Sequence, residues 1–420
     1  MSVQHSHTAV AEEPLTLAAA YDHLYETALR PSPIATIGLE LEGHLVDLHA
    51  PADRVGWDRI TALRSALPTF PGGSDVTTEP GGQIELSAPP RPVSAAIAAM
   101  RQDEATLRSA LAEIGLGVAR IGTDPARRAA RVNPEPRYAA METHFGAIGQ
   151  LRAGKAMMCS TAALQLNLDA GPAAGWADRV QLAHRLGPVL IALSACSPLL
   201  AGRFTGWRSS RQRVWNALDA ARCGPILGRD GVDPAEDWAR YALRAPVMLV
   251  RDGETGGAEP VRGAVPFESW VAGRIRLGDR SPTLADLDYH ATTLFPPVRL
   301  RGFLELRYLD AVPTRWWPAL AAITTALLDD PVASAVAAEA AEPVAGRWLT
   351  AAREGLGDPE LRRAAVRCTA AAATVVPAEL SADVAAFAER AEAGRDLGAD
   401  LAERARRDGA LAVLEEEARA

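Results

Sequence analysis

The sequence has almost no lysine, few cysteines and no long basic run. Lys155 is the single lysine among 420 residues, and the formal net charge is -8. Nucleic acid and anionic membrane surfaces are therefore not expected as main partners. The four cysteines lie far apart without Cys-x-x-Cys spacing, so neither a disulfide framework nor a zinc site is predicted.

Neither a membrane-spanning segment nor a signal peptide is predicted. The longest apolar stretch, residues 186–201, contains Gly187, Pro188 and Pro198 and is too short to cross a bilayer, which favours a buried core helix. The first 13 residues are polar and are predicted to be disordered. We expect a cytoplasmic protein with no membrane partner.

Two common hydrolase motifs, Gly-x-Ser-x-Gly and His-Glu-x-x-His, do not occur. This argues against serine-nucleophile and zinc hydrolases. Residues 149–156 match the phosphate-loop pattern except that Ala156 stands where a magnesium-binding Ser or Thr is required. We therefore interpret that segment as structural.

Four short segments alternate between apolar residues and carboxylates or amides. They are residues 36–44, 82–87, 164–169 and 303–308. Successive side chains of a strand point to opposite faces, so each segment predicts one apolar and one polar face. The polar face would carry Glu40, Glu42, Glu85 and Glu305. If the strands are neighbours, each close carboxylate pair costs about 4 kcal/mol, which divalent cations or shared protons would have to offset.

The remaining pattern predicts helices around these strands and a helical tail. Helices are expected over residues 14–29, over 93–114 with an apolar stripe able to cover a sheet, and over 209–224. Residues 120–138 read as a loop, and residues 247–251 as a strand that enters a hairpin at Asp252-Gly253. We predict a disordered N-terminus (1–13), a catalytic domain (14–312) and an Ala-rich helical segment packed on it (313–420).

Two motifs join turn residues to charged side chains. In residues 77–87 a glycine pair permits a tight turn before the strand that delivers Glu85. In residues 290–307 two hydroxyls precede a proline turn, after which Arg299, Arg301, Glu305 and Arg307 project at even intervals. Phosphate transfer uses this mixture, because carboxylates hold magnesium and guanidinium groups bind phosphate and carboxylate oxygens.

These segments resemble the glutamate-cysteine ligases of the plant and bacterial type. The resemblance covers roughly residues 34–312 and rests on six ordered motifs: Gly38–Glu42, Glu79–Ser87, Met157–Asp169, Ser194–Pro198, Arg211–Gly224 and His290–Pro296. Within the family, the segment Met157-Met-Cys-Ser-Thr161 and the Ala-rich tail are most similar to the actinobacterial branch, which makes gamma-glutamylcysteine for ergothioneine biosynthesis.

The resemblance implies an α+β fold like that of glutamine synthetase: a curved, mainly antiparallel sheet with helices on its convex face. It further implies ATP and Mg²⁺ as cofactors, and L-glutamate and L-cysteine as substrates. The implied reaction forms a gamma-glutamyl phosphate, which the cysteine amine then attacks. Nothing in the sequence indicates the oligomeric state.

Site residues follow from the same resemblance. Metal ligands are expected at Glu40, Glu42, Glu79, Glu85 and Glu305. Nucleotide contacts are expected from Gln165, Thr292, Thr293, Arg299 and Arg301. Substrate contacts are expected from Asn167, Arg211, Trp215 and Arg222. Catalytic roles are expected for Glu85, Glu305 and Arg307.

Some alternatives stay open at this point. The chain could join glutamate to an amine other than cysteine, because the thiol pocket is not visible in a sequence. A non-enzymatic cation-binding protein is the more distant alternative, and Arg299, Arg301 and Arg307 argue against it because a cation store gains nothing from guanidinium groups. Arg211 and Arg222 could instead form a surface ion pair with Asp219.

Overall fold

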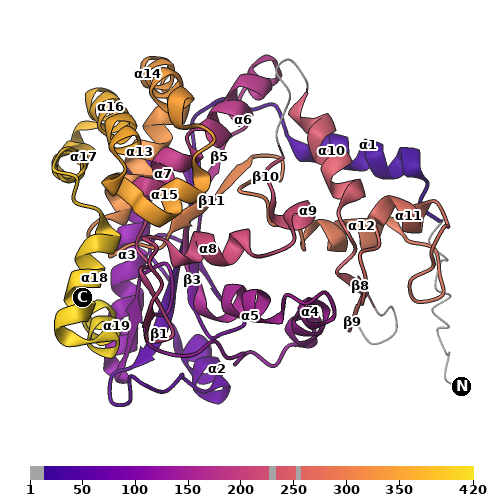
Figure 1. The fold of residues 1–420 in the computed structure, drawn as a ribbon, viewed down its shortest axis with the longest axis horizontal. Coiled ribbons are helices and arrows are strands. Elements are labelled where there is room, and N and C mark those ends of the chain that lie inside the picture. The colour runs from indigo at the N-terminus through magenta and orange to yellow at the C-terminus, as the bar shows by residue number, and fades with distance from the viewer. Residues whose placement is uncertain (1–13, 227–232, 252–256) are drawn as a thin grey trace, which may run out of the picture.

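The computed structural model describes residues 14–226, 233–251 and 257–420. The segment predicted to be disordered, residues 1–13, and the Asp252-Gly253 turn lie outside these ranges. A seven-stranded sheet lies at the centre, and helices surround it (Figure 1). The α+β class with a mainly antiparallel sheet, expected from the sequence, is confirmed.

The four alternating segments form four consecutive strands of this sheet. Its order is β10-β11-β5-β1-β3-β2, and β4 pairs with β1. The strands are β1 Ile37–Asp47, β2 Asp75–Thr78, β3 Ile84–Arg91, β4 Leu116–Ala119, β5 Ala163–Leu168, β10 Val298–Leu300 and β11 Leu304–Asp310. Two small hairpins are separate: β6 Leu199–Leu200 with β7 Arg203–Phe204, and β8 Leu249–Arg251 with β9 Ala258–Pro260.

Strand register brings the polar side chains together. Glu42 faces Glu85 across β1 and β3, and Glu40 faces Gln165 across β1 and β5. Glu305 faces Asn167 across β11 and β5. Since side chains alternate along each strand, these residues share one face. The predicted polar face is therefore assembled by antiparallel pairing.

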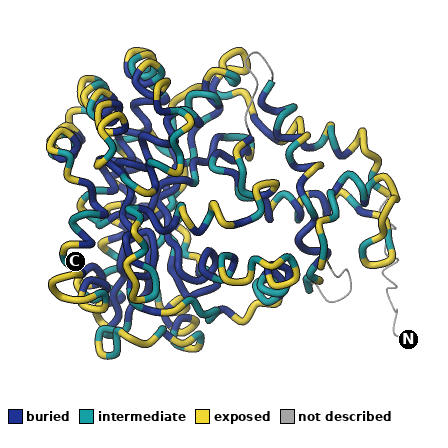
Figure 2. The backbone as a smooth tube through the Cα atoms, in the orientation of Figure 1, coloured by how far each residue is buried: buried dark blue, intermediate teal, exposed yellow. Residues whose placement is uncertain are grey.

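The opposite face of the sheet is buried under helices. Its apolar side chains, among them Leu39, Leu86 and Leu166, are fully buried. Figure 2 shows that buried residues are concentrated in the interior of the molecule. Helix α3 (Val93–Glu113) packs against β1, β3 and β4, with Ile97, Met100 and other members of its apolar stripe in the core. Helix α7 (Gly187–Ser194), every residue of which is buried, packs against β11. The predicted buried helix within residues 186–201 is confirmed.

The rest of the chain before residue 312 forms further helices. The first part of the chain contributes α1 Leu17–Ala28, α2 Trp57–Ala66, α4 Pro136–Ala147, α5 Leu151–Ser160, the short 3-10 helix Ala173–Gly175, and α6 Trp176–Arg185. They are followed by α8 Ser210–Asn216, α9 Ala220–Cys223, α10 Pro234–Arg244, α11 Phe267–Val271 and α12 Leu284–Ala291. Figure 1 shows α1 and α10 to α12 on the side away from the C-terminus. The predicted 120–138 loop ends earlier than expected, because α4 begins at Pro136.

The segment after residue 312 is helical, as expected. It contains α13 Trp317–Asp329, α14 Pro331–Ala341, α15 Trp348–Glu354, α16 Pro359–Val375, α17 Ala378–Glu392, α18 Leu397–Asp408, α19 Ala410–Arg419, and 3-10 turns at Glu342–Val344 and Gly355–Gly357. Helix α13 packs on α3, α16 on α7 and α19 on β4. One hydrophobic core includes residues from before and after residue 312. The domain boundary between residues 312 and 313 stays a prediction.

Within the described ranges no single helix is long and apolar enough to span a membrane. Helix α13 and residues 331–344 reach that length and composition only together, across a bend of 96°.

A buried ion cluster joins this C-terminal segment to the sheet. The Glu104 carboxylate on α3 accepts hydrogen bonds from Arg120, from the Trp317 indole (2.7 Å) and from the Thr314 hydroxyl (2.9 Å), and Arg108 lies 3.5 Å away. Burial opposes ionisation of Glu104, but Arg120 and Arg108 outweigh it and hold its pKa below the ordinary value of 4.5.

We predict that Glu104→Gln lowers the free energy of unfolding by about 3–5 kcal/mol, because two guanidinium groups lose a buried partner. A lowered folded-state pKa contributes stability that is present above the unfolded pKa and is lost as the pH falls through the folded value. The difference from wild type in denaturant titrations should thus be full at pH 7 and shrink below about pH 4.5. A difference that does not change with pH would contradict this account.

Candidate active site

A cavity of about 410 Å³ lies on the polar face of the sheet. All five carboxylates predicted as metal ligands line it: Glu40, Glu42, Glu79, Glu85 and Glu305. They come from β1, β3, β11 and the turn between β2 and β3. The sequence prediction that these side chains gather in one place agrees with the structure.

A row of hydrogen bonds crosses the floor of this cavity. The Gln165 amide donates to Glu42 (2.7 Å) and accepts from Arg307 (2.8 Å). Arg307 also donates to Glu305 (2.7 Å), which accepts two further bonds from Arg299 (2.5 and 2.8 Å). Four adjacent strands are thereby linked by side chains as well as by backbone pairing.

Glu305 has its negative charge neutralised by protein groups. Burial opposes its ionisation, but Arg299 and Arg307 outweigh burial and lower its pKa to about 2. Both carboxylate oxygens accept guanidinium donors. In this arrangement Glu305 and Arg299 bind each other, and Arg299 also donates to the Leu294 carbonyl (3.2 Å). Metal binding by Glu305 and nucleotide binding by Arg299 stay predictions.

The other carboxylates lack comparable compensation. Burial, followed by repulsion from Glu85, raises the pKa of Glu40 and of Glu42 to about 7. The same two causes, in the same order, raise the pKa of Glu79 well above its usual range. Among the described residues, the donors to Glu40 and Glu42 are amide and backbone groups: Asn167 donates to Glu40 (2.8 Å), and Gln165 and the Ala163 N–H donate to Glu42.

This surplus of buried negative charge fits a divalent cation. Oxygen ligands of this kind are preferred by Mg²⁺, which neutralises them without guanidinium donors. Among the described residues, however, no three His, Cys, Asp or Glu side chains are grouped closely enough to make a complete metal site. Coordination by Glu40, Glu42, Glu79 and Glu85 therefore stays a prediction.

On three residues that line the same cavity, several buried donors find no hydrogen-bond partner among the described residues. They are Nε and Nη1 of Arg211, Nε1 of Trp215 and Nε of Arg307. Arg211 is 3% exposed, and its remaining nitrogen, Nη2, donates to the Arg307 carbonyl (2.7 Å). Unsatisfied buried donors cost free energy, and a bound carboxylate or phosphate would satisfy them.

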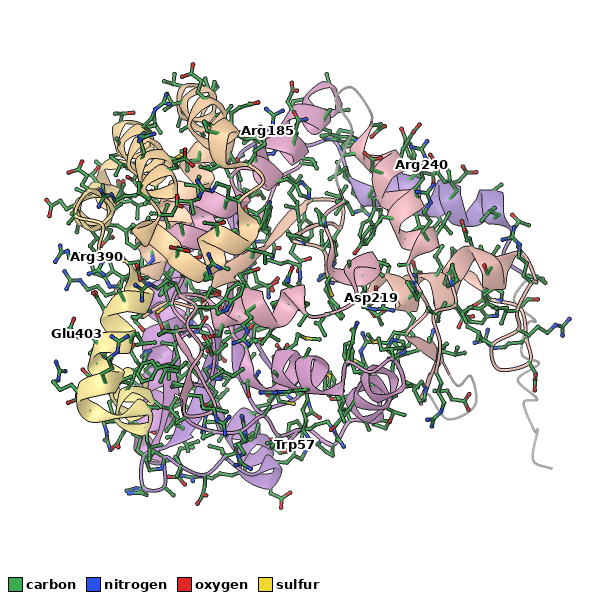
Figure 3. The ribbon with its side chains drawn as sticks, in the orientation of Figure 1. Trp57, Arg185, Asp219, Arg240, Arg390 and Glu403 are labelled. Atoms are coloured by element: carbon green, nitrogen blue, oxygen red, sulfur yellow. The ribbon has the colours of Figure 1, made fainter. Side chains whose placement is uncertain are left out.

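The predicted helix over residues 209–224 is wrong, because it is broken into α8 and α9. Asp219 (labelled in Figure 3) begins α9 instead of continuing α8, and its side chain accepts from the Ala221 N–H (3.0 Å). Asp is a preferred N-cap, so a break at this position has a local cause. Arg211, Trp215, Asp219 and Arg222 consequently do not share one helical face.

The break separates the predicted substrate residues. Arg211 and Trp215 line the cavity, and the guanidinium of Arg211 lies 6.0 Å from the indole ring. Arg222 is fully buried outside the lining, where it donates to the Thr293 carbonyl (2.9 Å) and hydroxyl (3.0 Å) and to Pro246. Substrate binding by Arg222 and nucleotide binding by Thr293 are thus not supported by their positions.

Of the other predicted nucleotide contacts, Gln165, Thr292, Arg299 and Arg301 line the cavity. Asn167, predicted to bind substrate, lies next to the residues that line the cavity, and its amide donates a hydrogen bond to the Glu40 carboxylate (2.8 Å).

Sequence reasoning missed one wall of the cavity. It is formed by residues of α4, α5 and the loop after α12: Arg137, Tyr138, Met141, Met157, Met158 and Phe295. Phe295 contacts Trp215 edge to face at 5.7 Å, and Arg137 donates to the Thr292 hydroxyl at 2.9 Å. Met157 was visible only as part of a motif, since helical periodicity alone does not distinguish a cavity wall from core.

Comparison with known proteins identifies the family. The profile of Glutamate-cysteine ligase family 2 (GCS2) matches residues 36–417. The chain belongs to this family. The match extends into the C-terminal helices, beyond the residues that carried the resemblance.

Curated relatives agree with this assignment. The chain is 52% identical over 410 residues to "Glutamate--cysteine ligase EgtA" of Mycolicibacterium smegmatis, which covers 97% of this chain and 96% of that protein. It is 54% identical over 363 residues to the Mycobacterium tuberculosis protein of the same name, covering 86% and 84%. The chloroplastic glutamate-cysteine ligase of Medicago truncatula is 30% identical over 68% of this chain and 56% of its own length.

Among solved structures, a Francisella tularensis glutamate-cysteine ligase in complex with AMP has a similar fold. Its TM-score is 0.57 at 11% identity, covering 93% of this chain and 88% of that one. At this identity the likeness concerns the fold alone.

We predict that two Glu→Gln substitutions in this cavity have different effects on the free energy of unfolding. Glu305→Gln should lower the free energy of unfolding by about 3–5 kcal/mol, because Arg299 and Arg307 lose their charged partner. Glu85→Gln should leave stability unchanged or slightly higher, because it removes one repulsive charge, while abolishing turnover. Denaturant titration of both variants without metal measures the contrast. Equal stabilities, or wild-type turnover of Glu85→Gln at ordinary magnesium concentrations, would contradict this division of roles.

Proposed function

We propose that this protein ligates the gamma-carboxylate of L-glutamate to the amine of L-cysteine, using ATP and Mg²⁺. The reaction proceeds through gamma-glutamyl phosphate: a glutamate oxygen takes the terminal phosphoryl group and ADP leaves. The cysteine nitrogen then attacks the acyl carbon, and phosphate leaves with formation of the amide bond and loss of a proton.

One observation carries this proposal: residues with unpartnered buried donors line the same cavity as Glu40 and Glu42, whose carboxylates accept from amide and backbone donors. A cation store would use only the carboxylates, and an anion-binding site would use only the donors. A reaction that brings a metal-bound triphosphate to an amino-acid carboxylate uses both. Family membership supports the same chemistry.

Glu40, Glu42, Glu79 and Glu85 are the residues that would hold Mg²⁺. The cation, when bound, would neutralise phosphate charge and orient the nucleotide. Gln165 fixes the Glu42 carboxylate, and Asn167 fixes that of Glu40, so two of the proposed ligands are pre-positioned by amides.

The arginines have two separate roles in this proposal. Arg211 binds a carboxylate of glutamate through its guanidinium group, on which Nε and Nη1 have no partner among the described residues, and Trp215 packs beside the substrate. Arg307, whose guanidinium group donates to Glu305 and Gln165, would act on the transferring phosphoryl group from the same cavity. A guanidinium group placed in this way stabilises charge in the transition state.

We place the reaction in the cytoplasm and assign its product to ergothioneine biosynthesis, in line with the mycobacterial relatives named EgtA.

The direct test is ADP release by the purified protein with glutamate, ATP, Mg²⁺ and a panel of amino acids. We expect rapid release only when cysteine is present, with gamma-glutamylcysteine as the product by mass spectrometry. Faster release with another amine would establish a different carboxylate-amine ligase. Release that does not depend on any amine would refute ligation.

We predict that Arg211→Lys raises the KM for glutamate by about tenfold or more, which corresponds to about 1.4 kcal/mol. Lysine keeps the charge but cannot present two donors to one carboxylate. Arg213→Lys is the matched control, because Arg213 is exposed on the same helix and stacks near Trp207 instead of lining the cavity. A glutamate KM within about threefold of wild type in Arg211→Lys would indicate a purely structural role.

A further inference from the structure

Strand β1 changes partners next to one of the proposed metal ligands. It pairs with β5 as far as Leu41, and with β4 from His44 onward. Glu42 lies in this gap. Its backbone carbonyl accepts a hydrogen bond from Nη1 of Arg120 (3.1 Å), a side chain that follows β4 and is 1% exposed.

Arg120 is itself held from the C-terminal segment. Its Nε donates to Glu104, and Glu104 also accepts from the Trp317 indole and the Thr314 hydroxyl. Trp317 begins α13, and Thr314 lies in the loop before it. A continuous set of buried contacts therefore runs from residues 314–317 through α3 to the peptide of Glu42.

The carboxylate and the backbone carbonyl of Glu42 accept hydrogen bonds from different parts of the structure. Its carboxylate accepts from Gln165 and from the Ala163 N–H, which come from β5 within the sheet. Its carbonyl is held by Arg120, which is not part of the cavity lining. Rotation or displacement of the strand at this position would move the carboxylate relative to Glu40 and Glu85.

A buried ion pair is a poor source of stability, because desolvation offsets most of the attraction between its charges. The hydrogen bond from Arg120 to the Glu42 carbonyl gives the Glu104–Arg120 pair a role besides stability. Groups that orient metal ligands strongly affect metal affinity. We propose that Arg120 is a positioning residue for the magnesium site, and that the C-terminal helical segment acts on the site through Trp317 and Glu104. This inference rests on the proposed function of Glu42 as a ligand.

The test compares two Arg→Lys variants from the same cluster. Arg120→Lys keeps a charge beside Glu104 but is too short to hold both Glu104 and the Glu42 carbonyl. Arg108→Lys is the control, because Arg108 also pairs with Glu104 but donates to Thr314 (2.7 Å) instead of β1. The full-length proteins are titrated with Mg²⁺ by calorimetry, and the Mg²⁺ dependence of ADP release is measured in parallel.

We expect Arg120→Lys to weaken Mg²⁺ binding about tenfold or more, with the kcat at saturating Mg²⁺ within about twofold of wild type. Arg108→Lys should bind Mg²⁺ within about twofold of wild type. A role in stability alone predicts lower melting temperatures for both variants and an unchanged Kd for Mg²⁺. That result would overturn the proposal.

Trp317→Phe provides the second variant. It keeps the aromatic ring but removes the donor to Glu104, so it should weaken Mg²⁺ binding in the same direction by a smaller factor. If Arg120→Lys does not fold, an unchanged Kd in Trp317→Phe overturns the proposal. A wild-type protein that binds no Mg²⁺ and shows no ligation would refute the proposed function instead, so the two failures are distinguishable.

Discussion

The polar face of the central sheet buries more carboxylate charge than its arginines neutralise, and the candidate site depends on this imbalance. Glu305 takes both nearby guanidinium groups and stays ionised. Glu40 and Glu42 receive mainly amide and backbone donors, so burial and repulsion from Glu85 raise their pKa values. A bound cation would restore the balance, and the unpartnered nitrogens of Arg211 would in turn attract the anionic substrate.

The fold holds this arrangement by covering the other face of the sheet completely. Helices α3 and α7 bury the apolar side chains of the strands, and the C-terminal helices extend the same hydrophobic core. The apolar face therefore supplies the stability that the crowded carboxylates reduce. The C-terminal segment is joined to the catalytic strands by both apolar packing and the buried Glu104 cluster, which fits the match of one family profile to residues 36–417.

Alternation in the sequence was enough to predict four strands and the residues of each face, because the side-chain period of a strand is two. The structure shows that these strands are neighbours. Alternation could not predict which charges neutralise each other. The pairing of Glu305 with Arg299 depends on the register between β10 and β11, which places the two residues opposite each other. The prediction of one helix over residues 209–224 was also wrong, because the Asp219 side chain caps a new helix, α9, at this point. The wall around Tyr138 and Met157 comes from helices whose sequences carry no chemical signature.

The most direct test of the charge imbalance is the melting temperature of the nucleotide-free protein with and without millimolar Mg²⁺, with NaCl of equal ionic strength as the control. A cation that binds only the folded state stabilises it by mass action. The account predicts a melting temperature that rises with Mg²⁺ concentration and does not rise with NaCl. A melting temperature that Mg²⁺ leaves unchanged, or lowers, would contradict the claim that the buried carboxylates form a cation site.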